Sequence, residues 1–233
     1  MTHAIRSSNR GVTLIEVAIV LVILGLLVAG IISAQQLLQA AKVRSIVGEV
    51  ERFDGAINLY VEKFRAFPGD HPAASDFFQG INNGDGDGRI EYSGGSVTSA
   101  EGNLAWQHLS AAKLVEGVYD GEPDAIVGTS VPASKSAGGG GGYALNFNTT
   151  IGNHLVLGLA EGVGSGLIDA PILTPTFAYS VDKKLDDGIP DTGNVRGIGL
   201  GGAAGNCYDS GVTPSAYFFS DDNLRCYMHI KLQ

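Results

Sequence analysis

The sequence predicts an α+β protein in which a long N-terminal α-helix packs on a loop-rich antiparallel β-sheet domain. Three observations predict this class. Residues 12–34 are almost entirely apolar, residues 43–64 continue with apolar side chains at spacings of three and four, and residues 226–232 alternate apolar with polar side chains. The 34 glycines among 233 residues indicate many turns and loops around these elements.

The first element is an apolar run that is long enough to cross a membrane. Residues 12–34 include a single charged residue, Glu16, and residues 17–41 include none. As an α-helix, the run covers about 30 Å of hydrocarbon. Arg6 and Arg10 precede it without any acidic neighbour. By the positive-inside rule, the short N-terminus is expected to stay cytoplasmic and the acidic remainder to be exported.

The apolar run has no well-placed signal-peptidase site behind it. The small residues at 29–34 lead directly into a helix-forming stretch, so one interpretation is a simple signal anchor. Two details favour another interpretation. Gly11 lies between the charged leader and the apolar run, and Glu16 lies inside the run.

Residues 10–16, which read Arg-Gly-Val-Thr-Leu-Ile-Glu before the aliphatic run, resemble the prepilin signal of type IV pilins and type II secretion pseudopilins. The resemblance implies that a membrane aspartyl peptidase cuts after Gly11 and methylates the new N-terminus at Val12. It also implies that Glu16, the fifth mature residue, pairs with the N-terminal ammonium of a neighbouring subunit during assembly. The alternative is that Glu16 only reaches the cytoplasmic interface of the membrane.

The same resemblance implies the domain organisation and the partners. A leader occupies residues 1–11, a helix with a transmembrane first part occupies 12–64, and an exported pilin-like globular domain occupies 65–233. The expected location is the bacterial inner membrane, with the globular domain periplasmic, followed by a pilus or pseudopilus. Expected partners are the lipid bilayer, prepilin peptidase, the inner-membrane assembly machinery, and copies of itself or other pilins. Nucleic acid is not expected, because the formal net charge is −9.

Beyond the membrane segment, the apolar periodicity predicts a helix face on which the exported domain packs. Its members are Val43, Ile46, Val50, Phe53, Ile57, Tyr60 and Phe64. The other face carries charged residues, Glu49 and Glu51 among them. A residue that precedes proline avoids the α region, so Pro68 and Gly69 predict a helix end near residue 64.

The remaining elements are predicted from short patterns. A capping box at residues 98–101 opens a helix through Leu104, Leu109 and Leu114, and Thr174-Pro175 opens a second one that ends at Gly188. Candidate strands are residues 143–149, 154–159, 216–219 and 226–232. The five glycines at 138–142 are followed by no Lys-Ser/Thr, so a flexible loop is expected there rather than a phosphate site.

An aspartate-glycine segment, residues 83–91, fits part of a calcium-loop template. Oxygen-bearing side chains at template positions 1, 3, 5 and 9 are Asn83, Asp85, Asp87 and Glu91, and the carbonyl of Arg89 adds another oxygen. The acid of position 12 is absent, and Glu101 or water is expected to replace it. A solvated Asp-Gly turn is the alternative. A second group, Asp182, Asp186, Asp187 and Asp191, is interpreted as surface charge at a helix end, with a metal site as the alternative.

The two cysteines, Cys207 and Cys226, are expected to form a disulfide if the domain is exported to an oxidising compartment. Eighteen residues lie between them, and Gly211 and Pro214 allow the chain to turn back. Similar C-terminal disulfides occur in many pilins. The alternative is a pair of buried reduced cysteines.

Enzyme motifs are not found. The five histidines show no HExxH spacing, and no serine lies in a G-x-S-x-G turn. The sequence therefore predicts a non-enzymatic structural subunit. The alternative function is a minor pilin that acts as a calcium-dependent adhesin or ligand-binding subunit through glycine-rich loops at 94–96 or 138–142.

Overall fold

The computed structural model describes residues 11–92, 100–160, 168–200 and 204–232, and the chain divides into two units, Met1–Ala41 and Lys42–Gln233. Helix α1 (Leu14–Phe64) begins in the first unit and ends in the second. It is an uninterrupted helix, as expected. Near its N-terminus it has the length and apolar composition needed to cross a membrane, with a mean hydropathy of 3.0.

In the second unit, one face of α1 is buried against the sheet domain. The predicted stripe is confirmed, because Ile46, Val50, Phe53, Ile57 and Tyr60 are each at most 5% exposed. The prediction for the charged face was wrong at one position: Glu49 is only 6% exposed. The helix ends where proline and glycine predict it to end.

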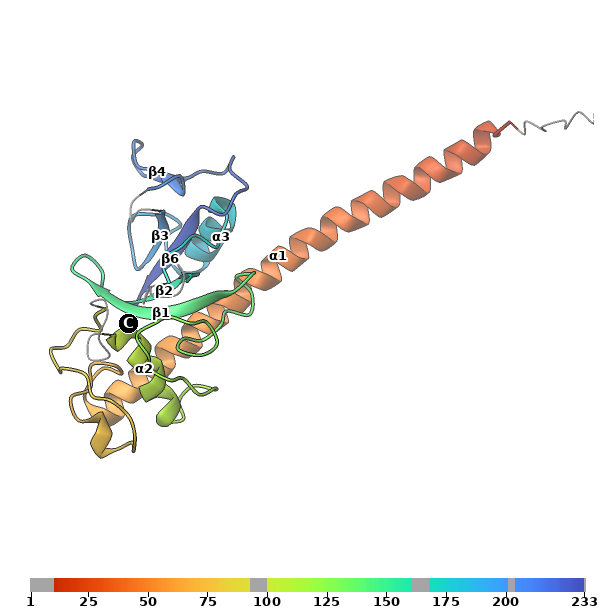
Figure 1. Ribbon diagram of the computed structural model, residues 1–233. Coiled ribbons are helices and arrows are strands. Elements are labelled where there is room, and N and C mark those ends of the chain that lie inside the picture. The colour runs from red at the N-terminus through yellow and green to blue at the C-terminus, as the bar shows by residue number, and fades with distance from the viewer. Residues whose placement is uncertain (1–10, 93–99, 161–167, 201–203, 233) are drawn as a thin grey trace, which may run out of the picture. The chain divides into compact units, whose positions relative to one another are not determined.

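Four antiparallel strands form the main sheet in the order β1-β2-β6-β3 (Figure 1). Their bounds are β1 (Gly141–Asn148), β2 (Gly152–Leu159), β3 (Val195–Gly199) and β6 (Cys226–Lys231). A separate pair consists of β4 (Tyr208–Asp209) and β5 (Ala216–Tyr217). The α+β class and the antiparallel sheet are therefore confirmed.

The described part of the unit also contains two further α-helices and one short 3₁₀ helix: η1 (Ala74–Asp76), α2 (Glu101–Ala111) and α3 (Pro175–Leu185). Figure 1 shows α3 beside β3 and β6. The predicted N-terminus of α3 is confirmed, since the Thr174 hydroxyl accepts the backbone N–H of Phe177 at 3.3 Å. This helix ends at Leu185, three residues earlier than expected.

The core is centred on Phe53 of α1. Its ring meets Trp106 of α2 edge-on at 4.9 Å and Tyr143 of β1 at 5.1 Å between ring centroids. All three side chains are almost completely buried. Helices α1 and α2 and strand β1 thus share one core. Because α1 and α2 pack on each other there, the N-terminus of α2 is held near the turn that follows α1.

Several details differ from the sequence-based expectations. Strands β3 and β4 had not been predicted, and the strand expected at 216–219 is the two-residue β5. Gly141 and Gly142 belong to β1 rather than to a loop. Helix α2 ends before Leu114, and Ala100 at its N-cap position provides no side-chain cap. Thr98 and the glycine-rich loop at 94–96 lie outside the described residues.

Candidate functional site

Thr13 and Glu16 build the start of α1. The backbone N–H and the hydroxyl of Thr13 donate to Glu16 Oε2 at 3.0 and 2.9 Å, and the backbone N–H of Glu16 points back at Thr13 Oγ1 at 3.3 Å. This reciprocal capping box satisfies backbone groups that no helical carbonyl can reach. Gly11 and Val12 precede the helix in irregular, exposed backbone. The Thr-x-x-Glu spacing of residues 13–16 is the sequence signature that predicts this cap.

The helix that follows the cap is apolar and exposed. Every side chain from residue 11 to residue 41 is exposed in the single chain, including Leu14 at 89% and Leu26 at 70%. A contiguous apolar surface of this size marks a membrane or protein contact surface. Lipid or other helices are therefore the expected surroundings of this segment.

A second candidate site lies in the globular unit, where three carboxyl groups that are distant in sequence meet. One oxygen from each of Asp70, Asp85 and Glu101 lies within 4.8 Å of the other two. Asp70 lies in the turn after α1, Asp85 in the following loop, and Glu101 at the start of α2. Asp70 and Glu101 are each 2% exposed, whereas Asp85 is open to solvent. We call this group the three-carboxylate cluster.

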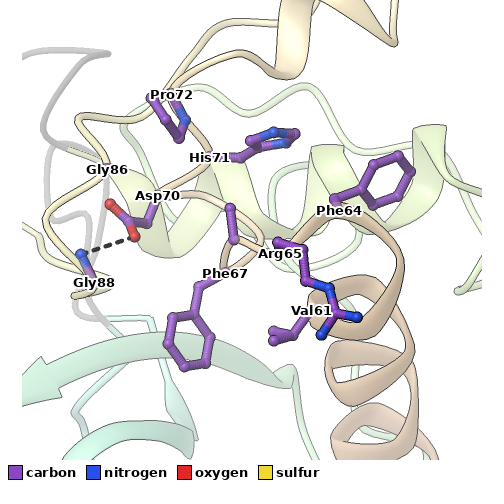
Figure 2. Close-up of a pocket in the computed structure, with 10 residues that line it drawn as sticks. Val61, Phe64, Arg65, Phe67, Asp70, His71, Pro72, Gly86 and Gly88 are labelled. Atoms are coloured by element: carbon purple, nitrogen blue, oxygen red, sulfur yellow. Dashed lines mark hydrogen bonds between the residues drawn. The ribbon is translucent and has the colours of Figure 1, made fainter.

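Backbone amides orient two of these carboxylates. The Gly88 N–H donates to Asp70 Oδ2 at 3.0 Å (Figure 2), and the amides of Asp85 and Glu91 donate to the two oxygens of Glu101 at 3.0 and 3.2 Å. Figure 2 also shows that the second oxygen of Asp70 points away from the Gly88 amide. This atom, Oδ1, is buried without a hydrogen-bond partner.

Two glycines allow the three segments to approach one another. A Cβ atom at Gly69, where φ is +90°, would collide with the carbonyl oxygen of Glu101, and one at Gly84 would collide with the carbonyl oxygen of Gly69. The Gly84 N–H donates to the carbonyl of His71 at 3.0 Å. The turn after α1, the loop and the N-terminus of α2 therefore form one packed arrangement.

Burial makes ionisation of the carboxyl groups in the cluster unfavourable. Loss of water raises the pKa of Asp70 to about 6. The backbone amides of Gly88 and Gly86 oppose this rise, and the nearby carboxylates of Asp87 and Asp85 add to it. Burial likewise raises the pKa of Glu101 to about 7, with Asp70 and Asp85 contributing. In the absence of a cation, these groups resist ionisation.

The structure brings only one of the predicted loop ligands, Asp85, into this cluster. The Asn83 side-chain oxygen accepts the Ser75 N–H at 2.8 Å. Arg89 lies 3.8 Å from Asp87 and 3.6 Å from Glu91, as exposed ion pairs. Glu101 had been considered as a substitute ligand, whereas Asp70 had not been considered. Asp70 lies 15 residues before Asp85, and no local pattern in the sequence links the two.

The second acidic group has a structural explanation. Oxygens of Asp182, Asp186 and Asp187 also lie within 4.8 Å of one another. Asp182, however, is completely buried and not a surface charge as expected. It accepts the Tyr217 hydroxyl at 2.8 Å and the Gly188 N–H at 3.1 Å, so both of its oxygens have partners. Burial raises its pKa to about 7.

The disulfide between Cys207 and Cys226 is present, as predicted, with a Cα–Cα distance of 5.0 Å. It links the residue before β4 to the first residue of β6. Both cysteines are completely buried. The bridge therefore joins the two sheets at a point that water does not reach.

Comparison with known proteins identifies the N-terminal segment. Residues 6–32 match the family model described as the prokaryotic N-terminal methylation motif, which is the type IV pilin/pseudopilin signal. The match includes Gly11, Val12, Glu16 and the first turns of α1, and it confirms the resemblance on which the sequence-based prediction rested. Comparisons with curated proteins and with solved structures gave no match.

Proposed function

We propose that the chain is a prepilin, the membrane-bound precursor of a structural subunit of a type IV pilus or a type II secretion pseudopilus. The observation that carries this proposal is the methylation motif at residues 6–32, in register with a helix that begins at Leu14. An α+β body behind a long N-terminal helix fits a pilin-like fold. The role is structural rather than enzymatic.

Processing takes place at the bond between Gly11 and Val12. This bond lies in exposed, irregular backbone just before the capping box of Thr13 and Glu16, so a peptidase reaches it without unwinding α1. The positive charges of Arg6 and Arg10 hold the leader on the cytoplasmic side. The products are a short basic leader and a mature subunit that retains its whole apolar helix.

Assembly uses the exposed apolar helix surface of residues 14–41. In the membrane, lipid covers this surface, and in a filament the equivalent helices of neighbouring subunits cover it. Cleavage creates an ammonium group at Val12, and Glu16 is the only acid within residues 12–41. Among the described residues, the exposed Glu16 carboxylate is bonded only within its own first turn, so it is able to accept a neighbour's ammonium.

Mass spectrometry of the full chain tests the processing step. The chain is expressed in cells with and without a prepilin peptidase and is extracted from membranes. With the peptidase, the expected mass is that of residues 12–233 plus one methyl group, and without it the leader remains. A Gly11→Leu variant should stay uncut in both strains. A mature N-terminus beyond Ala29 would contradict the prepilin assignment.

Electron microscopy of filaments tests the assembly step. Strains that produce the tagged wild-type chain should show the tag along pili or in secretion pseudopili. The uncleaved Gly11→Leu chain should stay in the membrane and be absent from filaments. Equal incorporation of the cleaved and uncleaved forms would contradict the proposed route of assembly.

A further inference from the structure

The three-carboxylate cluster is assembled by the fold from three separate segments. Asp70 follows α1, Asp85 lies in the loop between η1 and α2, and Glu101 is the first residue of α2. Their oxygens lie within 4.8 Å of one another, although Asp70 and Glu101 are 31 positions apart in the sequence. A solvated Asp-Gly turn at residues 83–91 does not explain why Asp70 and Glu101, which lie outside that turn, meet Asp85 while each is only 2% exposed.

A buried oxygen without a partner is the independent observation that indicates a ligand. Asp70 Oδ1 is inaccessible to solvent and accepts no hydrogen bond, although Oδ2 of the same carboxylate is bonded to the Gly88 amide. Buried polar atoms in folded proteins nearly always have a partner, and one left without it costs a large part of its desolvation free energy. The carboxylate with this free oxygen is the one that meets Asp85 and Glu101.

No basic side chain neutralises the cluster within the described part of the chain. The ion pairs there are those of Arg89 with Asp87 and Glu91, and of Arg225 with Asp221. None of them includes Asp70, Asp85 or Glu101. Three adjacent carboxylates without a counter-ion would repel one another, so a bound cation is the missing partner.

We propose that Asp70, Asp85 and Glu101 bind one calcium ion. Calcium takes six to eight oxygen ligands at about 2.4 Å, so three carboxylate oxygens that lie within 4.8 Å of one another can all contact one such ion. Exposed Asp85 leaves a side open for the waters that fill the remaining coordination positions. Magnesium requires shorter bonds and a near-ideal octahedral geometry, whereas calcium accepts irregular sets of carboxylates and waters.

The surrounding backbone already holds the ligands in place. Amides of Gly88, Asp85 and Glu91 bind the carboxylates of Asp70 and Glu101, and this shell orients the oxygens for the ion. The ion therefore joins the turn after α1, the loop and α2. Its expected effect is to stabilise the globular unit at the end of the helix through which the subunits assemble.

Thermal unfolding of the full chain in detergent tests the proposal, with the metal ions alone as probes. At a hundredfold excess of calcium over its Kd, the melting temperature should rise by about 5 °C or more above that in chelator. Asp85→Asn, an exposed and nearly isosteric change, should abolish this rise and leave the melting temperature in chelator unchanged or higher. The matched control is Asp87→Asn, two residues away in the same loop and outside the cluster, which should keep the rise.

Calorimetric titration with calcium chloride gives a second measurement, with one site per chain expected for the wild type and for Asp87→Asn, and no site for Asp85→Asn. Glu101→Gln should also lose the site. An unchanged melting temperature on chelation, or equal losses in Asp85→Asn and Asp87→Asn, would overturn the proposal. A rise with magnesium equal to that with calcium at the same concentration would overturn the assignment of the ion to calcium.

Discussion

The carboxylate of Glu49 on α1 accepts a hydrogen bond of 2.8 Å from the phenol of Tyr143 on β1, in the interior of the protein. The same carboxylate accepts the Ser134 hydroxyl at 2.9 Å and the Lys135 N–H at 3.1 Å. Burial, together with this neighbouring carboxylate, raises the pKa of Tyr143. The Glu49 side chain thus links α1 by hydrogen bonds to β1 and to the segment before β1.

Replacing Glu49 by alanine should therefore destabilise the globular unit. The Tyr143 hydroxyl loses its acceptor in the buried interior, and the Ser134 hydroxyl and Lys135 N–H lose theirs at part-buried positions. The expected loss of unfolding free energy is about 2–4 kcal/mol. Glu51→Ala, an exposed site on the same helix, is the control and should change stability by less than about 0.5 kcal/mol. Urea unfolding of the full chain in detergent measures both. Equal effects would show that the buried hydrogen bonds add nothing.

Glu16→Ala should leave membrane insertion intact and reduce filament assembly. Insertion depends on hydrophobicity, which the change increases, whereas assembly loses the carboxylate that meets a neighbour's ammonium. Thr13→Ala is the matched control, because it removes half of the capping box but keeps the charge. Subunit content of isolated filaments is the readout. If Thr13→Ala reduced assembly as much as Glu16→Ala, helix capping rather than pairing would explain the effect.

Removing the disulfide should lower the stability of the globular unit by about 3 kcal/mol in the chain-entropy model, given the sequence separation of 19 residues. The variant for this test carries Cys207→Ala and Cys226→Ala together, so that no free thiol remains. Chemical unfolding with and without reductant provides the measurement. The wild type should respond to reductant and the double variant should not. Thiol labelling of both cysteines in denatured, unreduced protein would contradict the bridge.

The contribution of His108 to stability should rise with pH between about 4 and 6.5, because His108 is buried as the neutral imidazole. Its Nδ1 accepts the Gly69 N–H at 3.0 Å, so its Nε2 carries the hydrogen and donates to the Asn82 carbonyl at 2.8 Å. Burial lowers the pKa of His108 to about 4. Over this pH window the unfolded chain binds the extra proton, so stability present above pH 6.5 is lost as the pH falls, by up to about 3 kcal/mol.

The His108→Gln variant isolates this contribution. It should be less stable than the wild type at pH 7, because one of the two hydrogen bonds is lost, yet the difference in stability between the two proteins should shrink as the pH falls from 6.5 to 4. The buried carboxyl groups of Asp70, Glu101 and Asp182, whose raised pKa values favour stability at low pH, contribute equally to both proteins. Buried His154 and His229, whose pKa values are also lowered, keep part of the dependence in both proteins. Urea unfolding at several pH values is the measurement. Parallel curves for the two proteins would exclude His108 as a contributor.

Periodic and local patterns explain what the sequence predicted correctly. The stripe from Ile46 to Tyr60 is long and regular, so one face of α1 had to be the packed face. The N-terminus of α3 was predicted from Thr174 and Pro175, because an N-cap hydroxyl and a proline at the first helical position act within a single turn. Strand β3 was missed because its Val-Arg-Gly-Ile-Gly sequence contains only two large apolar residues, and its pairing with β6 supplies the missing stability.

Long-range contacts explain what the sequence did not reveal. The capping pattern of Glu101 involves Thr98, which lies outside the described residues, whereas the bonds from the Asp85 and Glu91 amides to the Glu101 carboxylate are contacts that no local pattern predicts. Asp70 enters the cluster only because the glycines at 69 and 84 let distant segments touch. Glutamate is usually found at the surface. Glu49 is buried because its carboxylate accepts a hydrogen bond from Tyr143, which lies 94 residues later in the chain.

The internal position of β6 determines the order in which the protein matures. This strand is synthesised after β2 and β3 but lies between them in the sheet. Until residues 226–231 leave the ribosome, β2 and β3 lack their shared partner and the thiol of Cys207 has nothing to join. The growing polypeptide then contains only the β1–β2 hairpin of its main sheet. Anchoring through the apolar helix therefore comes first, and resistance to proteases is acquired only when synthesis has passed the last strand of the sheet.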